Sequence, residues 1–120
     1  MKQVILRNAT NTHSVLQVNR FLYLLENSVI KQKHEFEGNV KFALMQNLNF
    51  KFKDMIAIMH EADKLVKFYD WKDFLNGDLE SPKYQYKNWK KLTTILDVKF
   101  QNIEGLLIGD KVGEIYFLNV

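Results

Sequence analysis

Histidine is the side chain most often used for acid–base catalysis and metal binding near neutral pH. The chain has three histidines, His13, His34 and His60. His60-Glu61 matches the start of the helical zinc-protease motif, in which a second histidine follows four residues after the first. Lys64 occupies that position, so the required ligand pair is incomplete. His34 precedes Glu35, but strand alternation would place the two on opposite faces. We therefore expect no metal site and no cofactor.

Arg7 and His13 form a second candidate pair. The stretch Arg7-Asn8-Ala9-Thr10-Asn11-Thr12-His13 resembles the arginine-then-histidine spacing of a family of helical, metal-independent ribonucleases. In that family both side chains face a cleft between helices, so the resemblance implies a catalytic pair. The residues between them are poor helix formers, and the alternative interpretation is a turn that follows a strand.

Other catalytic sets are incomplete. The chain has no cysteine, which excludes a disulfide framework, a thiolate nucleophile and cysteine-based metal sites. Its three serines, Ser14, Ser28 and Ser81, lie outside any glycine-flanked nucleophile turn. We therefore expect a protein that is not an enzyme.

The strongest binding signal is the segment Lys83-Tyr84-Gln85-Tyr86-Lys87-Asn88-Trp89-Lys90-Lys91. Lysines neutralise phosphates and aromatic rings stack on bases, a combination typical of proteins that bind single-stranded nucleic acid. The same residue types also form hot spots in protein interfaces. Phe50-Lys51-Phe52-Lys53 repeats the pattern. The predicted binding surface consists of Lys83, Tyr84, Tyr86, Lys87, Trp89, Lys90 and Lys91, with Lys51 and Lys53. A structural alternative is that Trp89 anchors the core from a helix.

Charge is distributed in blocks along the chain. The net charge is +3, from 17 basic and 14 acidic residues. Residues 31–53 and 83–100 are rich in lysine, whereas residues 54–80 carry seven carboxylates against three lysines. The blocks either form a two-signed surface that steers a charged partner, or pair with each other across the fold.

The elements that must position these residues are predicted from hydrophobic spacing. The sequence predicts a strand at Val4–Leu6 and helices over residues 12–29 and 54–69. Asp70 and Gly77 bracket a predicted short helix from Trp71 to Asn76. Pro82 is expected to precede a further helix through Phe100, and apolar runs in residues 105–118 predict a C-terminal hairpin.

Residues 34–53 fit strands better than a helix, with a turn at Gly38-Asn39, although helical spacing is also present. The expected fold class is therefore α+β. A single domain over residues 1–120 would contain a short antiparallel sheet, made of the N-terminal strand, a possible central hairpin and the C-terminal hairpin. Three to four helices would pack on it.

Composition places the chain among globular proteins, since 47% of its residues are apolar and 26% are charged. We find no targeting signal and no apolar run long enough to span a membrane, so we expect a cytoplasmic location.

Leu106-Leu107-Ile108-Gly109 and Glu114-Ile115-Tyr116-Phe117-Leu118 resemble the end of the small nuclease-A-inhibitor-like proteins, which implies an inhibitor. The leading hypothesis is a non-enzymatic interaction protein that occupies a functional surface of a larger nuclease or nucleoprotein, as toxin-immunity and anti-CRISPR proteins do. The first alternative is a module that binds RNA or single-stranded DNA. The second is the ribonuclease.

Overall fold

The computed structural model describes residues 3–45, 54–101 and 103–119, which form three antiparallel sheets. Sheet 1 contains β1 (Val4–Asn8), β2 (His13–Val18), β3 (Phe21–Glu26) and β4 (Val29–Glu35). Sheet 2 contains β5 (Val40–Leu44), β6 (Met55–His60), β7 (Leu65–Asp70) and β8 (Tyr84–Lys87). Sheet 3 contains β9 (Leu92–Phe100), β10 (Ile103–Asp110) and β11 (Ile115–Asn119). Within these residues the only helix is α1 (Trp71–Leu75), so the α+β prediction is wrong and the fold is nearly all β.

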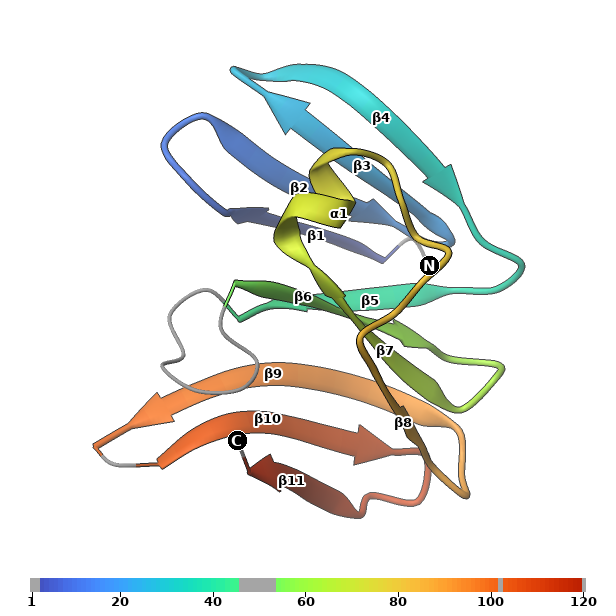
Figure 1. Ribbon diagram of the computed structural model, residues 1–120. Helices are drawn as coiled ribbons and strands as arrows, with labels where there is room; N and C mark the ends of the chain where they lie inside the picture. Colours follow the sequence, from blue (N-terminus) through green and yellow to red (C-terminus); the bar gives the residue numbers. More distant parts are fainter. Residues whose placement is uncertain (1–2, 46–53, 102, 120) are drawn as a thin grey trace.

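The three sheets stack face to face in chain order, with sheet 2 in the middle (Figure 1). Within each sheet the strands follow one another as a meander. The first strands of the three sheets, β1, β5 and β9, converge around a hollow of about 250 Å³. Meanders stacked in this way around a common axis are the blades of a β-propeller, which typically has four to eight of them. The described residues therefore form three stacked meander sheets, which is the arrangement of neighbouring blades in such folds.

Sheet 2 is buried on both faces, and alternate residues of its strands enter two different cores. Ala57 and Met59 of β6 belong to the core shared with sheet 3, whereas Ile56 and Ile58 belong to the core shared with sheet 1. Consecutive residues of a strand point to opposite faces, so a strand covered on both sides needs an unbroken apolar run. The sequence Met55–Met59 supplies it, and all five residues are buried.

The helix predicted over residues 12–29 is wrong, because this stretch forms β2 and β3 and the turns around them. Valines and leucines that repeat at helical spacing belong to separate strands joined by tight turns. Asn19 has φ +54°, and Asn27 and Ser28 have φ +50° and +67°. Two positive φ values in a two-residue loop fit the strand twist of a hairpin. These turns contain no glycine, which is why the sequence did not reveal them.

The predicted helices over residues 54–69 and 82–100 are also wrong. Residues 55–70 form the β6–β7 hairpin, whose turn ends at Lys64 with φ +59°. Residues after Pro82 form β8 and β9 instead of a helix. In both regions the apolar residues at helical spacing are also compatible with strands. Burial between neighbouring sheets stabilises the strands instead of a helix.

Three predicted elements are confirmed. β1 contains the predicted N-terminal strand, and β10 and β11 form the C-terminal hairpin. α1 follows Asp70 at its N-cap, and Gly77 adopts φ +76° after its end. α1 bridges two sheets, because Gln32 of β4 donates a hydrogen bond of 2.6 Å to the Leu75 carbonyl.

Residues 34–53 are only partly described. Gly38 and Asn39 lie between β4 and β5 as predicted. These strands belong to different sheets, however, so they do not form a hairpin. The predicted strand over residues 48–53 lies outside the described residues, as do Lys51 and Lys53. No helix within the described ranges is long and apolar enough to cross a membrane.

Candidate functional site

The predicted binding segment begins as an edge strand. β8 is the last strand of sheet 2 and pairs with β7 along one side. Tyr84 and Tyr86 lie opposite Phe68 and Val66, which are buried in the core between sheets 2 and 3. Tyr86 is half-buried against that core, whereas Tyr84 is exposed. The Tyr86 ring is therefore partly structural, and Tyr84 is the more accessible of the two.

A buried asparagine fixes the turn that follows β8. The side-chain amide of Asn88 donates to the Lys90 carbonyl at 2.9 Å, and its oxygen accepts from the Tyr86 hydroxyl at 3.0 Å. Its backbone N–H donates to the Lys64 carbonyl at 2.8 Å. These three bonds hold the turn from both sides, and they leave Trp89 at its tip with 89% of its surface exposed. The prediction that Trp89 anchors the core is wrong.

Three lysines of the segment lie beside carboxylates. Lys83 Nζ is 3.5 Å from Asp70, Lys90 Nζ is 3.5 Å from Glu114, and Lys91 Nζ is 3.9 Å from Glu61. Two of these carboxylates come from the acidic block of residues 54–80. The structure thus favours pairing of the charge blocks across the fold for this basic stretch. The predicted residues 83–91 do lie together, as one edge strand and its turn, with Trp89 at the exposed tip.

Arg7 and His13 lie on strands, in contact with different neighbours. Arg7 donates to the Leu6 carbonyl at 3.0 Å. Together with Asp97 it lines the hollow of about 250 Å³ between β1, β5 and β9. Burial raises the pKa of Asp97, and the positive charge of Arg7 partly offsets this effect. The His13 ring meets Trp71 edge-on, with 6.4 Å between centroids. A helical cleft, which the ribonuclease resemblance requires, is absent from the described part of the chain.

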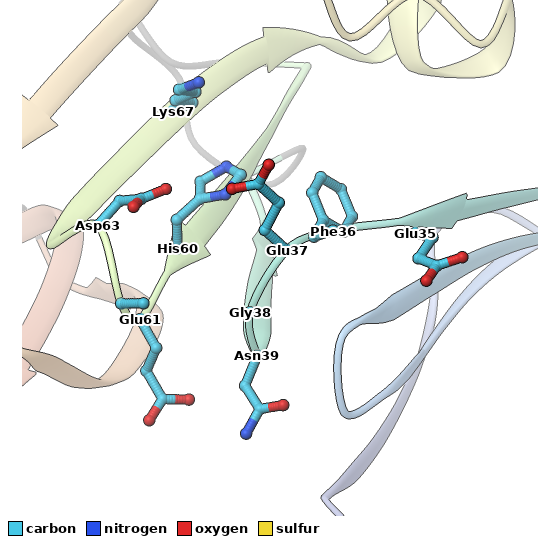
Figure 2. A pocket seen from close by; sticks show the side chains of 10 residues that line it. Glu35, Phe36, Glu37, Gly38, Asn39, His60, Glu61, Asp63 and Lys67 are labelled. Carbon is cyan, nitrogen blue, oxygen red and sulfur yellow. The ribbon is translucent and has the colours of Figure 1, made fainter.

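His60 borders a hollow of about 450 Å³ where β4 passes into β5 and β6 turns into β7. Figure 2 shows the side chains of Glu37, His60, Asp63 and Lys67 gathered around it. The His60 Nε2 atom is buried without a hydrogen-bond partner. Burial lowers the pKa of His60, and the positive charge of Lys67 lowers it further, while Asp63 opposes both. The neutral imidazole can accept a proton, but no serine or cysteine lines this hollow for it to activate.

Metal binding has no support within residues 3–45, 54–101 and 103–119. No group of three or more histidine and carboxylate side chains is placed there to hold an ion. Lys64, which stands where the zinc motif needs a second histidine, lies in the β6–β7 turn.

The sequence reasoning missed two exposed apolar surfaces at the ends of the stack. One is the face of sheet 3 that points away from sheet 2, which we call the outer face of sheet 3. It presents Leu96, Leu107 and Phe117 in one row across three strands. The other is the corresponding outer face of sheet 1, which presents Leu6, Leu16 and Tyr23 in one row. The available signal was apolar residues at both odd and even positions of β10 and β11, which is typical of strands covered on both faces.

Comparison with known proteins finds solved structures with a similar fold but no protein family to which the chain can be assigned. No protein-family description matches this chain, and no curated protein matches its sequence. A crystal structure of BBS1N in complex with ARL6DN, soaked with mercury, matches with a TM-score of 0.61 at 13% identity. A second, soaked with lead, matches with a TM-score of 0.60 at 13% identity. The alignments cover 98% and 97% of this chain but 36% of each matched chain. At this identity the likeness shows the fold alone.

Proposed function

We propose that this chain is a non-catalytic protein-binding module whose partner contacts Trp89 and the edge of β8. The observation that supports it is the exposed indole of Trp89, at the tip of a turn fixed by buried Asn88. An indole in water is unfavourable, and tryptophan is among the residues most enriched at binding hot spots. Because the turn is already ordered, it would lose little conformational freedom when a partner binds.

The surroundings of Trp89 suit a protein partner better than a nucleic acid. Lys83, Lys90 and Lys91 lie beside carboxylates, so binding a phosphate would require breaking or sharing these pairs. Mixed charges around an aromatic anchor are typical of the polar rim of a protein interface. The fold likeness is compatible with this proposal, since the similar BBS1N chain is in complex with ARL6DN.

The finer part of the proposal concerns the consequence of binding. We infer that the partner is a larger nuclease or nucleoprotein, and that the bound chain inhibits it by covering a functional surface. The incomplete catalytic sets around His13, His60 and the serines support a role without chemistry. Partner charges complementary to those around Trp89 would raise the association rate more than they would raise the affinity of the complex.

Co-purification from the native host tests the proposal. The wild-type chain should retain a protein partner after ribonuclease and deoxyribonuclease treatment. Trp89→Ala should reduce the retained partner at least about tenfold, because a buried tryptophan anchor contributes 2 kcal/mol or more. Val29→Ala is the matched control, since Val29 is also exposed beside a turn but lies on β4 of sheet 1. Retention that Trp89→Ala leaves unchanged would contradict the proposal, as would bound material that disappears with nuclease.

A further inference from the structure

β8 forms an open edge of sheet 2 (Figure 1). It pairs with β7 along one side, and within residues 3–45, 54–101 and 103–119 no strand pairs with its other side. Gln85 and Lys87 of this strand are exposed. The edge of sheet 1 at β4 is different, because Gln32 bridges it to α1. An open edge presents unpaired backbone N–H and C=O groups, which another polypeptide segment can pair with.

The register of β7 and β8 shows which backbone groups point outward. The Asn88 N–H donates to the Lys64 carbonyl at 2.8 Å, and these two residues continue the β7–β8 register by one position. Facing residues of an antiparallel pair alternate between hydrogen-bonded and non-hydrogen-bonded pairs. Tyr86 and Tyr84, two and four positions before Asn88, therefore bond to β7. The remaining residues of β8, whose N–H and C=O groups point away from the sheet, are Gln85 and Lys87.

The side chains of β8 indicate the residue types that would lie beside it. Tyr84 and Tyr86 point to the face that packs against sheet 3, and Gln85 and Lys87 point to the opposite face. The other three lysines of residues 83–91 lie beside carboxylates, whereas Lys87 has no ion-pair partner among the described residues. Opposite charges and aromatic–apolar pairs stabilise neighbouring strands. An adjacent strand should therefore present an acidic side chain beside Lys87 and apolar side chains beside the tyrosines.

We propose that the partner binds as an extended segment of alternating apolar and acidic residues, which adds a strand to sheet 2 beside β8. The inference rests on the proposed function, because it uses the same edge and the same partner. An extended polypeptide matches the outward N–H and C=O groups of β8 by main-chain hydrogen bonds, and its side chains give specificity. Trp89 follows Lys87 by two residues, so it contacts the end of the added segment. β8 contains no carboxylate, so the β8 strand of a second copy lacks the counterion for Lys87.

Peptide binding to the full chain tests this proposal. The probe is a fluorescent peptide selected from a phage-displayed library of random linear peptides of about ten residues, long enough to pair with all of β8. Gln85→Pro should raise its dissociation constant at least about tenfold, because proline removes the outward N–H and places its ring at the edge. Gln85→Ala keeps the N–H and is the matched control, with a change of less than about twofold. Lys87→Glu should raise the dissociation constant about threefold or more, because an attraction becomes a repulsion.

Gln85→Pro should fold, because the Gln85 N–H makes no bond to β7 and proline is tolerated where an edge N–H faces solvent. Its melting temperature should lie close to that of Gln85→Ala. Equal affinity of these two variants for the peptide overturns the proposal, as does a selection that yields no binding peptide.

Amide hydrogen exchange of the wild-type chain tests the same geometry without a substitution. In the free chain the amides of Gln85 and Lys87 should exchange faster than those of Tyr84 and Tyr86, which bond to β7. The selected peptide should slow exchange at Gln85 and Lys87. A bound peptide that leaves both of these amides in fast exchange overturns the proposal.

The partner retained in the co-purification described above separates the two proposals. Retention that falls with Trp89→Ala but is equal for Gln85→Pro and Gln85→Ala leaves the proposed function standing and overturns strand addition. Retention that falls with both Trp89→Ala and Gln85→Pro, but not with Gln85→Ala, supports both. Retention that none of these variants changes overturns both.

Discussion

At the scale of single residues, a substitution at Trp89 should affect partner binding without affecting stability. Its side chain makes little buried contact, so Trp89→Ala should change the free energy of unfolding by no more than about 0.5 kcal/mol. The same substitution should abolish most of the partner binding described above. Thermal unfolding of both proteins, followed by circular dichroism, measures the first quantity. A loss of several kcal/mol would show that the indole packs into the fold after all.

His60 makes stability depend on pH. Its pKa lies below the ordinary value of 6.5 in the folded chain, chiefly because of burial and then because of Lys67. Burial also lowers the pKa of His34. Below about pH 6.5 the unfolded chain therefore binds more protons than the folded chain, so stability falls as the pH is lowered through that value and stops falling below the folded pKa.

The melting temperature should therefore decrease between pH 7.5 and pH 5.5, a range above the ordinary pKa values of aspartate and glutamate. His60→Gln should make this decrease smaller without removing it, because His34 still titrates. His13→Gln, which leaves the half-buried imidazoles of His34 and His60 in place, is the control. A His60→Gln protein whose melting temperature falls as steeply as that of the wild type would contradict this prediction.

At the scale of elements, alanine substitutions at two glycines of β10 should have opposite effects on stability. A Cβ atom added at Gly105 would lie 2.3 Å from the Leu118 carbonyl oxygen and 2.6 Å from the Phe117 ring. Gly105→Ala should therefore force β11 away from β10 and destabilise the chain by about 1–3 kcal/mol. At Gly109 the nearest atom would be Thr94 Cβ at an ordinary 3.5 Å.

Gly109→Ala should accordingly leave stability unchanged or raise it by up to about 1 kcal/mol, since alanine restricts the unfolded chain more than glycine does. Urea unfolding of the two variants provides the comparison. Equal stabilities would show that β11 adjusts without loss, and that its pairing with β10 is not tightly constrained.

How far these elements could be predicted depended on their turns. α1 was predictable because Asp70 and Gly77 mark its ends, and the β10–β11 hairpin was predictable because its turn contains Gly113 with φ +89°. The hairpins of sheet 1 turn at Asn19 and at Asn27-Ser28, where asparagine and serine adopt positive φ without glycine. With the turns unrecognised, Val15, Val18, Leu22 and Leu25 formed a helical pattern across two strands.

At the scale of the whole molecule, the stacking of sheets could not be predicted from local spacing. Met55–Met59 is one apolar run, and a single sequence does not say whether it lies in a helix or in a strand covered on both faces. The decision comes from long-range packing, in which Ile56 and Ile58 meet sheet 1 while Ala57 and Met59 meet sheet 3. The binding segment of residues 83–91 stays a prediction, which rests on the concentration of aromatic and lysine residues there and does not depend on the element that holds them.

The balance of charge over the whole molecule predicts weak binding to nucleic acid. Each phosphate contact contributes about −0.7 to the slope of log affinity against log salt on single strands. Four lysines of the segment acting on phosphates would thus lower affinity roughly tenfold or more between about 50 mM and 200 mM salt. Because three of them lie beside carboxylates, we expect little affinity for a generic single-stranded RNA and a shallow slope.

The protein partner should behave differently. Its dissociation rate should change little over the same range of salt, because screening acts mainly on association. Fluorescence anisotropy with labelled RNA, and surface plasmon resonance with the captured partner, measure the two cases. Tight RNA binding that falls steeply with salt and is lost on charge removal at Lys83, Lys87, Lys90 and Lys91 would instead identify a nucleic-acid-binding module, with Trp89 stacking on a base.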